Sequence, residues 1–194
     1  RFDIYHHGNK MGTINLNLPG IHNVYNATAS IAVGVELNIA FDQIKRALET
    51  VEGVERRLEI KGESNGVTVI DDYGHHPTEI KVTLETIEEN WQNQRKVVVF
   101  QPHRYSRTRA LFGEFSRAFY QSDVLVVLPI YAAREKKIEV VTSQKLCEEI
   151  KAHGHKEVIY ADGFKAALSH LKQTLQPGDV LLTLGAGDVY RVGE

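Results

Sequence analysis

The stretch KVVVFQ at residues 96–101 is followed without a break by PHRYSRTR at residues 102–109. A short, valine-rich apolar run is typical of a strand that is buried on both faces of a parallel sheet. The segment after it carries three arginines and a histidine. In open α/β sheets, ligands bind beyond the carboxyl ends of the strands. The stretch therefore predicts a buried strand that leads into a charged loop at the binding edge of a sheet.

Strand and helix patterns alternate through the rest of the chain from about residue 57. Apolar strand-like runs occupy residues 67–71, 123–129, 157–161 and 179–185. Helical spacing of apolar residues is found in segments 80–91, 111–119, 146–150 and 164–171. This alternation predicts an α/β fold with a mostly parallel sheet that is covered by helices on both faces.

A hairpin precedes the parallel strands. Residues 58–64 and 67–71 are joined by Asn65 and Gly66, a pair that favours a type I′ turn. The first of these two strands is therefore predicted to be antiparallel, and we expect it at an edge of the sheet.

The first 54 residues have a different pattern. Residues 2–5 and 13–18 predict a β-hairpin, and two helices are predicted to follow, the second one capped by Asp42 and ending at Gly53. A hairpin and two helices bury too little apolar surface for a core of their own. We therefore expect residues 1–54 to be the tail of one domain, with an apolar face for further sequence, and residues 55–194 to be a second domain. The start at Arg1 and the end at Glu194 also favour a piece of a longer protein.

Composition excludes several classes of protein. The chain has 194 residues, of which 42% are hydrophobic and 25% charged, with 23 basic and 25 acidic side chains. These values are typical of a globular protein and exclude disordered and fibrous classes. A net charge of -2 gives no overall attraction to nucleic acid or to acidic lipid, and no apolar run reaches the roughly 20 residues of a membrane span. The single cysteine, Cys147, cannot form an internal disulfide, which fits a reducing cytoplasm. We therefore expect a cytoplasmic protein without membrane or nucleic-acid partners.

A second charged loop, DDYGHHP at residues 71–77, follows the strand at 67–71. Two polar loops at one edge of a sheet predict a site for a charged small molecule. Taken alone, an arginine-rich helix start is often only solvated, and a pair of aspartates is often only a turn. Arginines at a helix N-terminus oppose the helix dipole, so an anion that neutralises them would explain Arg104 and Arg107.

Other features give weaker signals. His22, Asn23 and Asn26 open a helix where a nucleotide could bind, although Asn23 as a simple N-cap is an equal alternative. Arg56 and Arg57 lie at the predicted hinge, where one of them could reach across a cleft or be only surface charge. The histidine spacings do not favour a zinc site. The turn at residues 185–188 (GAGD) lacks a complete dinucleotide-binding motif and is interpreted as a tight turn.

Four motifs together resemble those of one family. They are PGIHNVYNA (19–27), GVERRLE (53–59), DDYGHHPTE (71–79) and FQPHRYSRT (100–108). In this combination and order the chain resembles the Mur ligases of peptidoglycan synthesis over nearly its whole length. The first two motifs are shared across the family, while the last two point to the branch that joins L-alanine to UDP-N-acetylmuramate.

The resemblance implies a three-domain enzyme. This chain would hold the end of the central ATPase domain and most of the C-terminal Rossmann-like domain, which brings the amino acid. No G-x-x-x-x-G-K-[ST] phosphate loop occurs in the chain. We therefore expect the missing N-terminal and central domains to supply most contacts to ATP, Mg²⁺ and UDP-N-acetylmuramate, and the isolated chain to be inactive.

The resemblance also implies roles for individual residues. ATP phosphorylates the muramate carboxylate, and the amine of L-alanine then attacks the acyl phosphate. Arg104 and Arg107, expected one helical turn apart, suit a fork around the alanine carboxylate. Tyr73 and His75 would flank the reacting groups, with His75 accepting a proton from the alanine ammonium and His103 near a phosphate. The positions that resemble those holding the nucleotide are His22, Asn23, Asn26, Arg57 and Asp72.

Two alternatives remain at this stage. One is a ligase of the same family that recycles a murein tripeptide, which would need a larger pocket near Arg104. The other is a nucleotide-binding α/β module without catalysis, which would not explain the two charged loops.

Overall fold

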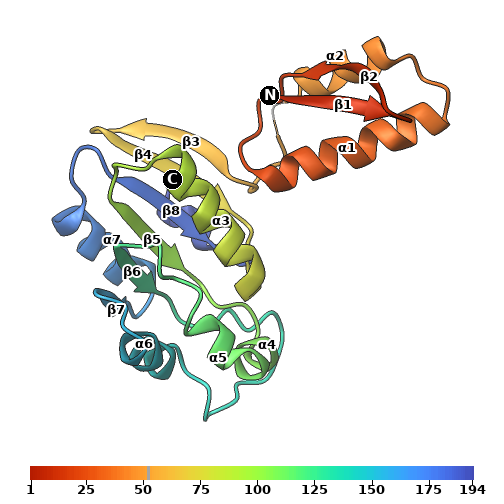
Figure 1. Cartoon of the computed structure of the whole chain (residues 1–194). Coiled ribbons are helices and arrows are strands. Elements are labelled where there is room, and N and C mark those ends of the chain that lie inside the picture. The colour runs from red at the N-terminus through yellow and green to blue at the C-terminus, as the bar shows by residue number, and fades with distance from the viewer. Residues whose placement is uncertain (52) are drawn as a thin grey trace. The chain divides into compact units, whose positions relative to one another are not determined.

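The computed structural model describes residues 1–51 and 53–194. They form two compact units, Arg1–Glu55 and Arg56–Glu194. The division lies one residue beyond the boundary expected from the sequence. Figure 1 labels the helices and strands of both units.

The first unit contains a hairpin and two helices. Its elements are β1 (Phe2–His6), β2 (Asn9–Ile14), α1 (Ile21–Glu36) and α2 (Phe41–Glu49). The prediction that the second strand covers residues 13–18 is wrong. The strand begins at Asn9 because His7 and Gly8, both with positive φ, turn the chain directly after β1. The exposed polar residues at the start of β2 lack the alternation that predicts a strand.

The first unit has a small core and an apolar surface. Four isoleucines from its four elements form the buried core: Ile4, Ile14, Ile31 and Ile44. By contrast, Ile21, Tyr25, Val33 and Leu37 of α1 and its C-cap are more than half exposed. A cavity of about 380 Å³ between β1, β2 and α1 is lined mainly by apolar side chains. The unit thus has the apolar face that its size leads one to expect.

The second unit is built on a six-stranded sheet. Its strands are β3 (Glu59–Ser64), β4 (Val67–Asp72), β5 (Lys96–Phe100), β6 (Val124–Val127), β7 (Val158–Tyr160) and β8 (Val180–Leu184). Their order is β3-β4-β8-β5-β6-β7, and only β3 is antiparallel to its neighbour. Asn65 and Gly66 have φ values of 52° and 77°, as a type I′ turn requires. The predicted α/β fold with an antiparallel edge strand is confirmed.

Helices cover both faces of this sheet (Figure 1). They are α3 (Pro77–Asn90), α4 (Tyr105–Ala110), α5 (Phe112–Phe115), α6 (Ser143–Ala152), α7 (Phe164–Thr174) and the 3₁₀ helix η1 (Val189–Val192). Successive residues of β5 point to opposite faces. Val98 and Phe100 pack with α3, α5 and α6, whereas Val97 and Val99 pack with α7 and η1. Pro77 opens α3, as predicted.

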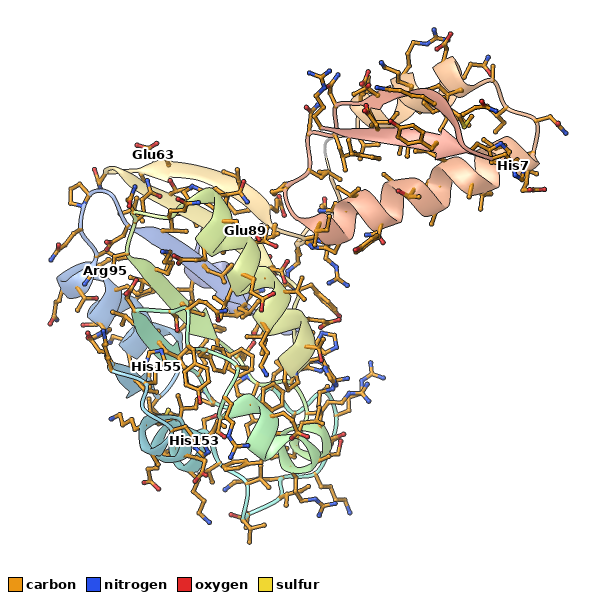
Figure 2. The ribbon with its side chains drawn as sticks, in the orientation of Figure 1. His7, Glu63, Glu89, Arg95, His153 and His155 are labelled. Carbon is orange, nitrogen blue, oxygen red and sulfur yellow. The ribbon has the colours of Figure 1, made fainter. Side chains whose placement is uncertain are left out.

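A salt bridge joins the starts of two neighbouring strands. Just before β5 and β8 begin, Arg95, which is labelled in Figure 2, donates to both carboxylate oxygens of Asp179, at 3.1 and 2.7 Å. At the other end, the loops after β4, β5, β6 and β8 leave the sheet on one edge, since these strands are parallel.

In the part of the chain that the structure describes, no helix is long and apolar enough to cross a lipid bilayer.

Candidate functional site

The two charged loops predicted from the sequence meet at the carboxyl edge of the sheet. His75 follows β4 and His103 follows β5, and their ring centroids are 5.8 Å apart. The ring of Tyr73 lies edge-on to that of His75, with centroids 5.4 Å apart. The loops are brought together although β8 separates β4 from β5 in the sheet.

The hydrogen bonds of His75 define its tautomer. Its Nδ1 lies 3.0 Å from the carbonyl oxygen of Tyr73. A carbonyl oxygen only accepts, so we assign the proton of the neutral ring to Nδ1. Nε2 then has a lone pair that can accept a proton from a bound molecule.

Glu79 fixes the loop that carries His75. Its Oε2 accepts from the backbone N–H groups of His75 and His76, at 2.9 and 3.1 Å. Burial acts to raise the pKa of Glu79, but these bonds and the nearby His75 and Arg57 charges together lower it. The carboxylate therefore remains charged at neutral pH. Sequence reasoning missed this contact; the His76-x-x-Glu79 spacing, which forms a capping box in the structure, is the signal that could have identified it.

His103 has the opposite hydrogen-bonding character. Its Nδ1 lies 3.4 Å from Nη1 of Arg107, and a guanidinium only donates, so Nδ1 accepts and Nε2 carries the proton. Burial lowers the pKa of His103, and the positive charge of Arg107 lowers it further. The ring is therefore neutral at pH 7, and its Nε2–H group can donate to a bound oxygen. Its face stacks on Tyr131, with centroids 5.4 Å apart and planes at 10°.

Arg104 and Arg107 lie at the start of α4. Arg104 has φ 73° and is the N-cap of the helix. Its carbonyl oxygen accepts from the N–H of Thr108 at 3.1 Å, which closes the first turn, so Arg104 and Arg107 have the one-turn spacing that the sequence predicts. The N–H of Arg104 bonds to the carbonyl oxygen of Tyr131 at 2.8 Å. The exposed Arg104 guanidinium makes no hydrogen bond or ion pair with residues 1–51 or 53–194.

An anion lies at the arginine-rich start of α4, but it belongs to the chain itself. The carboxylate of Glu135 accepts from the backbone N–H of Ser106 at 2.9 Å and from its hydroxyl at 2.5 Å. The hydrogen bonds from Ser106 lower the pKa of Glu135. A bound ligand is thus not required to satisfy this helix start. Sequence reasoning missed Glu135, which is 29 residues from Ser106.

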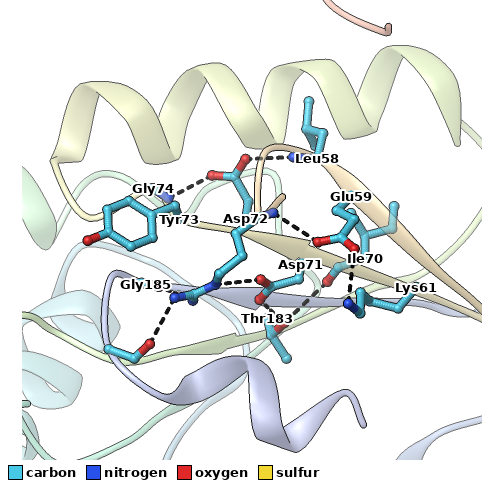
Figure 3. A network of polar contacts seen from close by, with 12 residues as sticks. Leu58, Glu59, Lys61, Ile70, Asp71, Asp72, Tyr73, Gly74, Thr183 and Gly185 are labelled. Atoms are coloured by element: carbon cyan, nitrogen blue, oxygen red, sulfur yellow. Dashed lines mark hydrogen bonds and ion pairs between the residues drawn. The ribbon is translucent and has the colours of Figure 1, made fainter. Parts of the chain in front are cut away.

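Asp72 faces the interior of the second unit and is 4% exposed. One oxygen accepts from the N–H of Leu58 at 2.9 Å and the other from the N–H of Gly74 at 2.7 Å (Figure 3). The second oxygen also accepts from the hydroxyl of Thr83 at 3.2 Å. Burial raises the pKa of Asp72, and these bonds partly offset the effect. These bonds to Leu58, Gly74 and Thr83 shape the 73–76 loop.

Arg56 binds within its own unit. Its guanidinium donates to Asp71 at 2.8 Å and to the carbonyl oxygens of Gly185 and Gly187 at 2.6 and 3.0 Å. It also lies over the rings of Tyr73 and Tyr190, 5.1 and 4.9 Å from their centroids. The idea that this arginine reaches across a hinge is therefore wrong for Arg56.

Arg57 is exposed and lies 5.9 Å from the Tyr73 ring centroid.

The turn at residues 185–188, which follows β8, is tight, as predicted. Gly185 has φ 146°, and a Cβ there would lie 2.7 Å from the carbonyl oxygen of Gln101.

The remaining predicted residues lie on the first two turns of α1, in the first unit. The N-cap is Gly20, so the alternative that Asn23 is the cap is wrong; its side chain instead donates to the Pro19 carbonyl oxygen at 2.7 Å. The Nδ1 of His22 is buried and has no partner among the described residues. Asn26 is exposed on the same part of the helix.

Within residues 1–51 and 53–194, no group of three or more acidic, histidine or cysteine side chains is placed to hold a metal ion.

Comparison with known proteins assigns the chain to a family. The chain is 61% identical over 193 residues to the UDP-N-acetylmuramate--L-alanine ligase of Desulforapulum autotrophicum, and 60% identical over 194 residues to that of Desulfosudis oleivorans. Each match includes all of this chain but only 42% of the relative's length.

Solved structures agree with this assignment. The UDP-N-acetylmuramate-alanine ligase MurC of Thermotoga maritima matches 93% of this chain and 38% of its own, with TM-score 0.75 and 32% identity. A murein peptide ligase of Psychrobacter arcticus shares the fold at 19% identity and TM-score 0.69, over 92% of this chain and 37% of its own. Residues 56–187 match the family described as Mur ligase, glutamate ligase domain. The chain therefore belongs to the Mur ligase family.

Proposed function

We propose that this chain is the amino-acid-binding part of an ATP-dependent ligase that joins L-alanine to UDP-N-acetylmuramate in peptidoglycan synthesis. Relatives at about 60% identity are named UDP-N-acetylmuramate--L-alanine ligase, and the chain spans 42% of their length. Residues 55–194 form the ligase domain, and residues 1–54 belong to the ATPase domain. The substrates place the enzyme in the cytoplasm.

The observation that carries the proposal is the convergence of the loops after β4 and β5, shown by the 5.8 Å between the rings of His75 and His103. The guanidinium of Arg104, which has no partner among the described side chains, binds the carboxylate of L-alanine. Arg107 adds a second positive charge and fixes His103. Tyr73 forms the wall next to His75.

The two histidines divide the proton chemistry between them. Nε2 of His75 accepts a proton from the alanine ammonium, so the amine nitrogen has a lone pair for attack. The nitrogen forms a bond to the activated muramate carbonyl carbon, the bond from that carbon to the phosphate oxygen breaks, and the second proton of the nitrogen leaves with the departing phosphate. The Nε2–H group of His103 donates to an oxygen on which negative charge develops.

Nucleotide contacts come from the other predicted residues. ATP supplies the phosphoryl group that activates the muramate carboxylate. His22, with its unsatisfied Nδ1, and Asn23 and Asn26 lie on one end of α1, where they can contact the nucleotide. Arg57 is an exposed cation suited to a phosphate. The chain has no G-x-x-x-x-G-K-[ST] phosphate loop, so we assign Mg²⁺ to other parts of the ligase and expect the 194 residues alone not to turn over.

The test is Arg104→Ala in the complete ligase. Losing a charge-assisted bidentate contact costs about 2 to 4 kcal/mol, so the KM for L-alanine should rise roughly 30-fold or more, with the KM for ATP within about twofold. Arg109→Ala, an exposed arginine on the same helix, is the matched control and should leave both values unchanged. An unchanged KM for L-alanine in Arg104→Ala would reject the assignment.

The tripeptide alternative is tested by the same enzyme with murein tripeptide in place of L-alanine. We expect L-alanine to have the higher kcat/KM, since the similarity to the murein peptide ligase concerns the fold alone.

A further inference from the structure

We infer that Glu135, in the loop after β6, is a positioning residue that sets the arginines of the alanine site. The inference rests on the proposed function. It concerns a segment, residues 129–135, to which the sequence motifs assign no role.

This segment runs alongside the charged loop after β5. The N–H of Tyr131 bonds to the carbonyl oxygen of Pro102, and the N–H of Arg104 bonds to the carbonyl oxygen of Tyr131, both at 2.8 Å. His103 and Tyr131 form an isolated parallel bridge, and their rings stack. The backbone conformation of Arg104 is thus held from the loop after β6.

Glu135 binds the start of α4, which follows this loop directly. The helix α4 has six residues and no acidic residue in its first turn, and its N-cap, Arg104, has no side-chain acceptor. The carboxylate of Glu135 supplies the missing acceptor through its two bonds to Ser106. These bonds fix where α4 begins, and therefore where Arg107 projects relative to Arg104.

The loop is shaped to deliver this carboxylate. The N–H of Glu135 bonds to the carbonyl oxygen of Ala132 at 2.9 Å, closing a turn whose central residues, Ala133 and Arg134, have φ values of 47° and 71°. Two consecutive non-glycine residues in the left-handed region are uncommon and persist where the surroundings require them.

Glu135 does not compete with the substrate carboxylate for the guanidinium of Arg104. Its carboxylate is close enough to Arg104 for the charge of that arginine to affect it, yet within the described residues the two side chains form no ion pair. Ser106 occupies both carboxylate oxygens. The guanidinium of Arg104 is consequently left to bind the carboxylate of the substrate.

The experiment compares variants of the complete ligase. In Glu135→Ala both bonds to Ser106 are lost, and we expect the KM for L-alanine to rise about tenfold, with kcat and the KM for ATP within about twofold. Ser106→Ala loses only the hydroxyl bond and should give a smaller rise. In the double variant the effect should not exceed that of Glu135→Ala, because both changes break one contact. Glu139→Gln, an exposed glutamate four residues along the same loop, is the control and should be unchanged.

The outcomes separate the inference from the proposed function. If Arg104→Ala raises the KM for L-alanine and Glu135→Ala does not, the positioning role is refuted and the function stands. If neither variant changes it, the proposed function fails. A fall in kcat with an unchanged KM in Glu135→Ala would also refute the positioning role. Should Glu135→Ala lose its native circular dichroism spectrum, the KM of Ser106→Ala decides, because this variant keeps the backbone bond to Glu135.

Discussion

Replacing Arg56 by alanine should destabilise the second unit. Arg56 joins the end of β4 to the turn after β8 through one ion pair and two bonds to carbonyl oxygens. Its partner Asp71 has a side chain that is 2% exposed. Without Arg56, this buried carboxylate keeps only the bond from Thr183 at 2.5 Å, and the Gly185 and Gly187 carbonyl oxygens lose a donor.

The expected magnitude follows from this geometry. Removing one partner of a buried ion pair costs about 3–5 kcal/mol because a charge remains buried without compensation. The Arg56 side chain is 21% exposed, so water can partly replace it at Asp71. We therefore expect the lower end, about 3 kcal/mol, which corresponds to a fall in Tm of roughly 10 °C for a unit of this size.

The assay is urea unfolding of the 194-residue chain. Trp91 is the single tryptophan and packs against the core of the second unit, so its fluorescence reports the unfolding of that unit. Arg104→Ala is the control: its exposed side chain has no partner among the described residues, and it should change the free energy of unfolding by less than about 0.5 kcal/mol. A loss below about 1 kcal/mol in Arg56→Ala would show that the Arg56 contacts do not contribute as argued.

Two further changes test other parts of the fold. His155 (Figure 2) is buried against Ser122, and burial lowers its pKa. As the pH falls, His155 is therefore protonated in the unfolded chain before it is protonated in the folded one. The neutral His155 ring stabilises the fold fully above about pH 6.5, and this stabilisation is lost as the pH falls toward the lower pKa of the folded state. In urea unfolding, the free energy of unfolding should therefore fall more steeply between about pH 6.5 and 5.5 in the wild type than in His155→Gln. Equal slopes in the two proteins would contradict this role. Gly185→Ala should lower the free energy of unfolding by at least about 2 kcal/mol, since the new Cβ would meet the Gln101 carbonyl oxygen. The control Gly113→Ala has open space at its Cβ and should lower it by less than about 0.5 kcal/mol. Similar unfolding curves for the two variants would refute the steric argument.

Local sequence patterns predicted much of the fold. The valine-rich run at residues 96–101 is a strand buried on both faces, and the Asn65-Gly66 pair makes the predicted turn. The rule that ligands bind beyond strand ends identified the two loops whose histidines meet. These features depend on side chains close together in sequence.

Features that depend on distant residues could not be predicted in this way. The insertion of β8 between β4 and β5 is set by packing across the whole sheet. The left-handed conformation of Arg104 is stabilised by Tyr131, and the start of α4 by Glu135, neither of which is near in sequence. The network that buries Asp72 likewise joins β4 to Leu58 and Thr83. A motif therefore identified the loop, while contacts from another loop determined its geometry.

A crystal structure of the complete ligase with L-alanine and a non-hydrolysable ATP analogue tests most directly whether the two loops form the alanine site. We predict that the alanine carboxylate accepts hydrogen bonds from the guanidinium of Arg104 and that the alanine nitrogen lies within hydrogen-bond reach of His75 Nε2. L-alanine bound at a different edge of the sheet, with Arg104 in contact only with solvent, would contradict it.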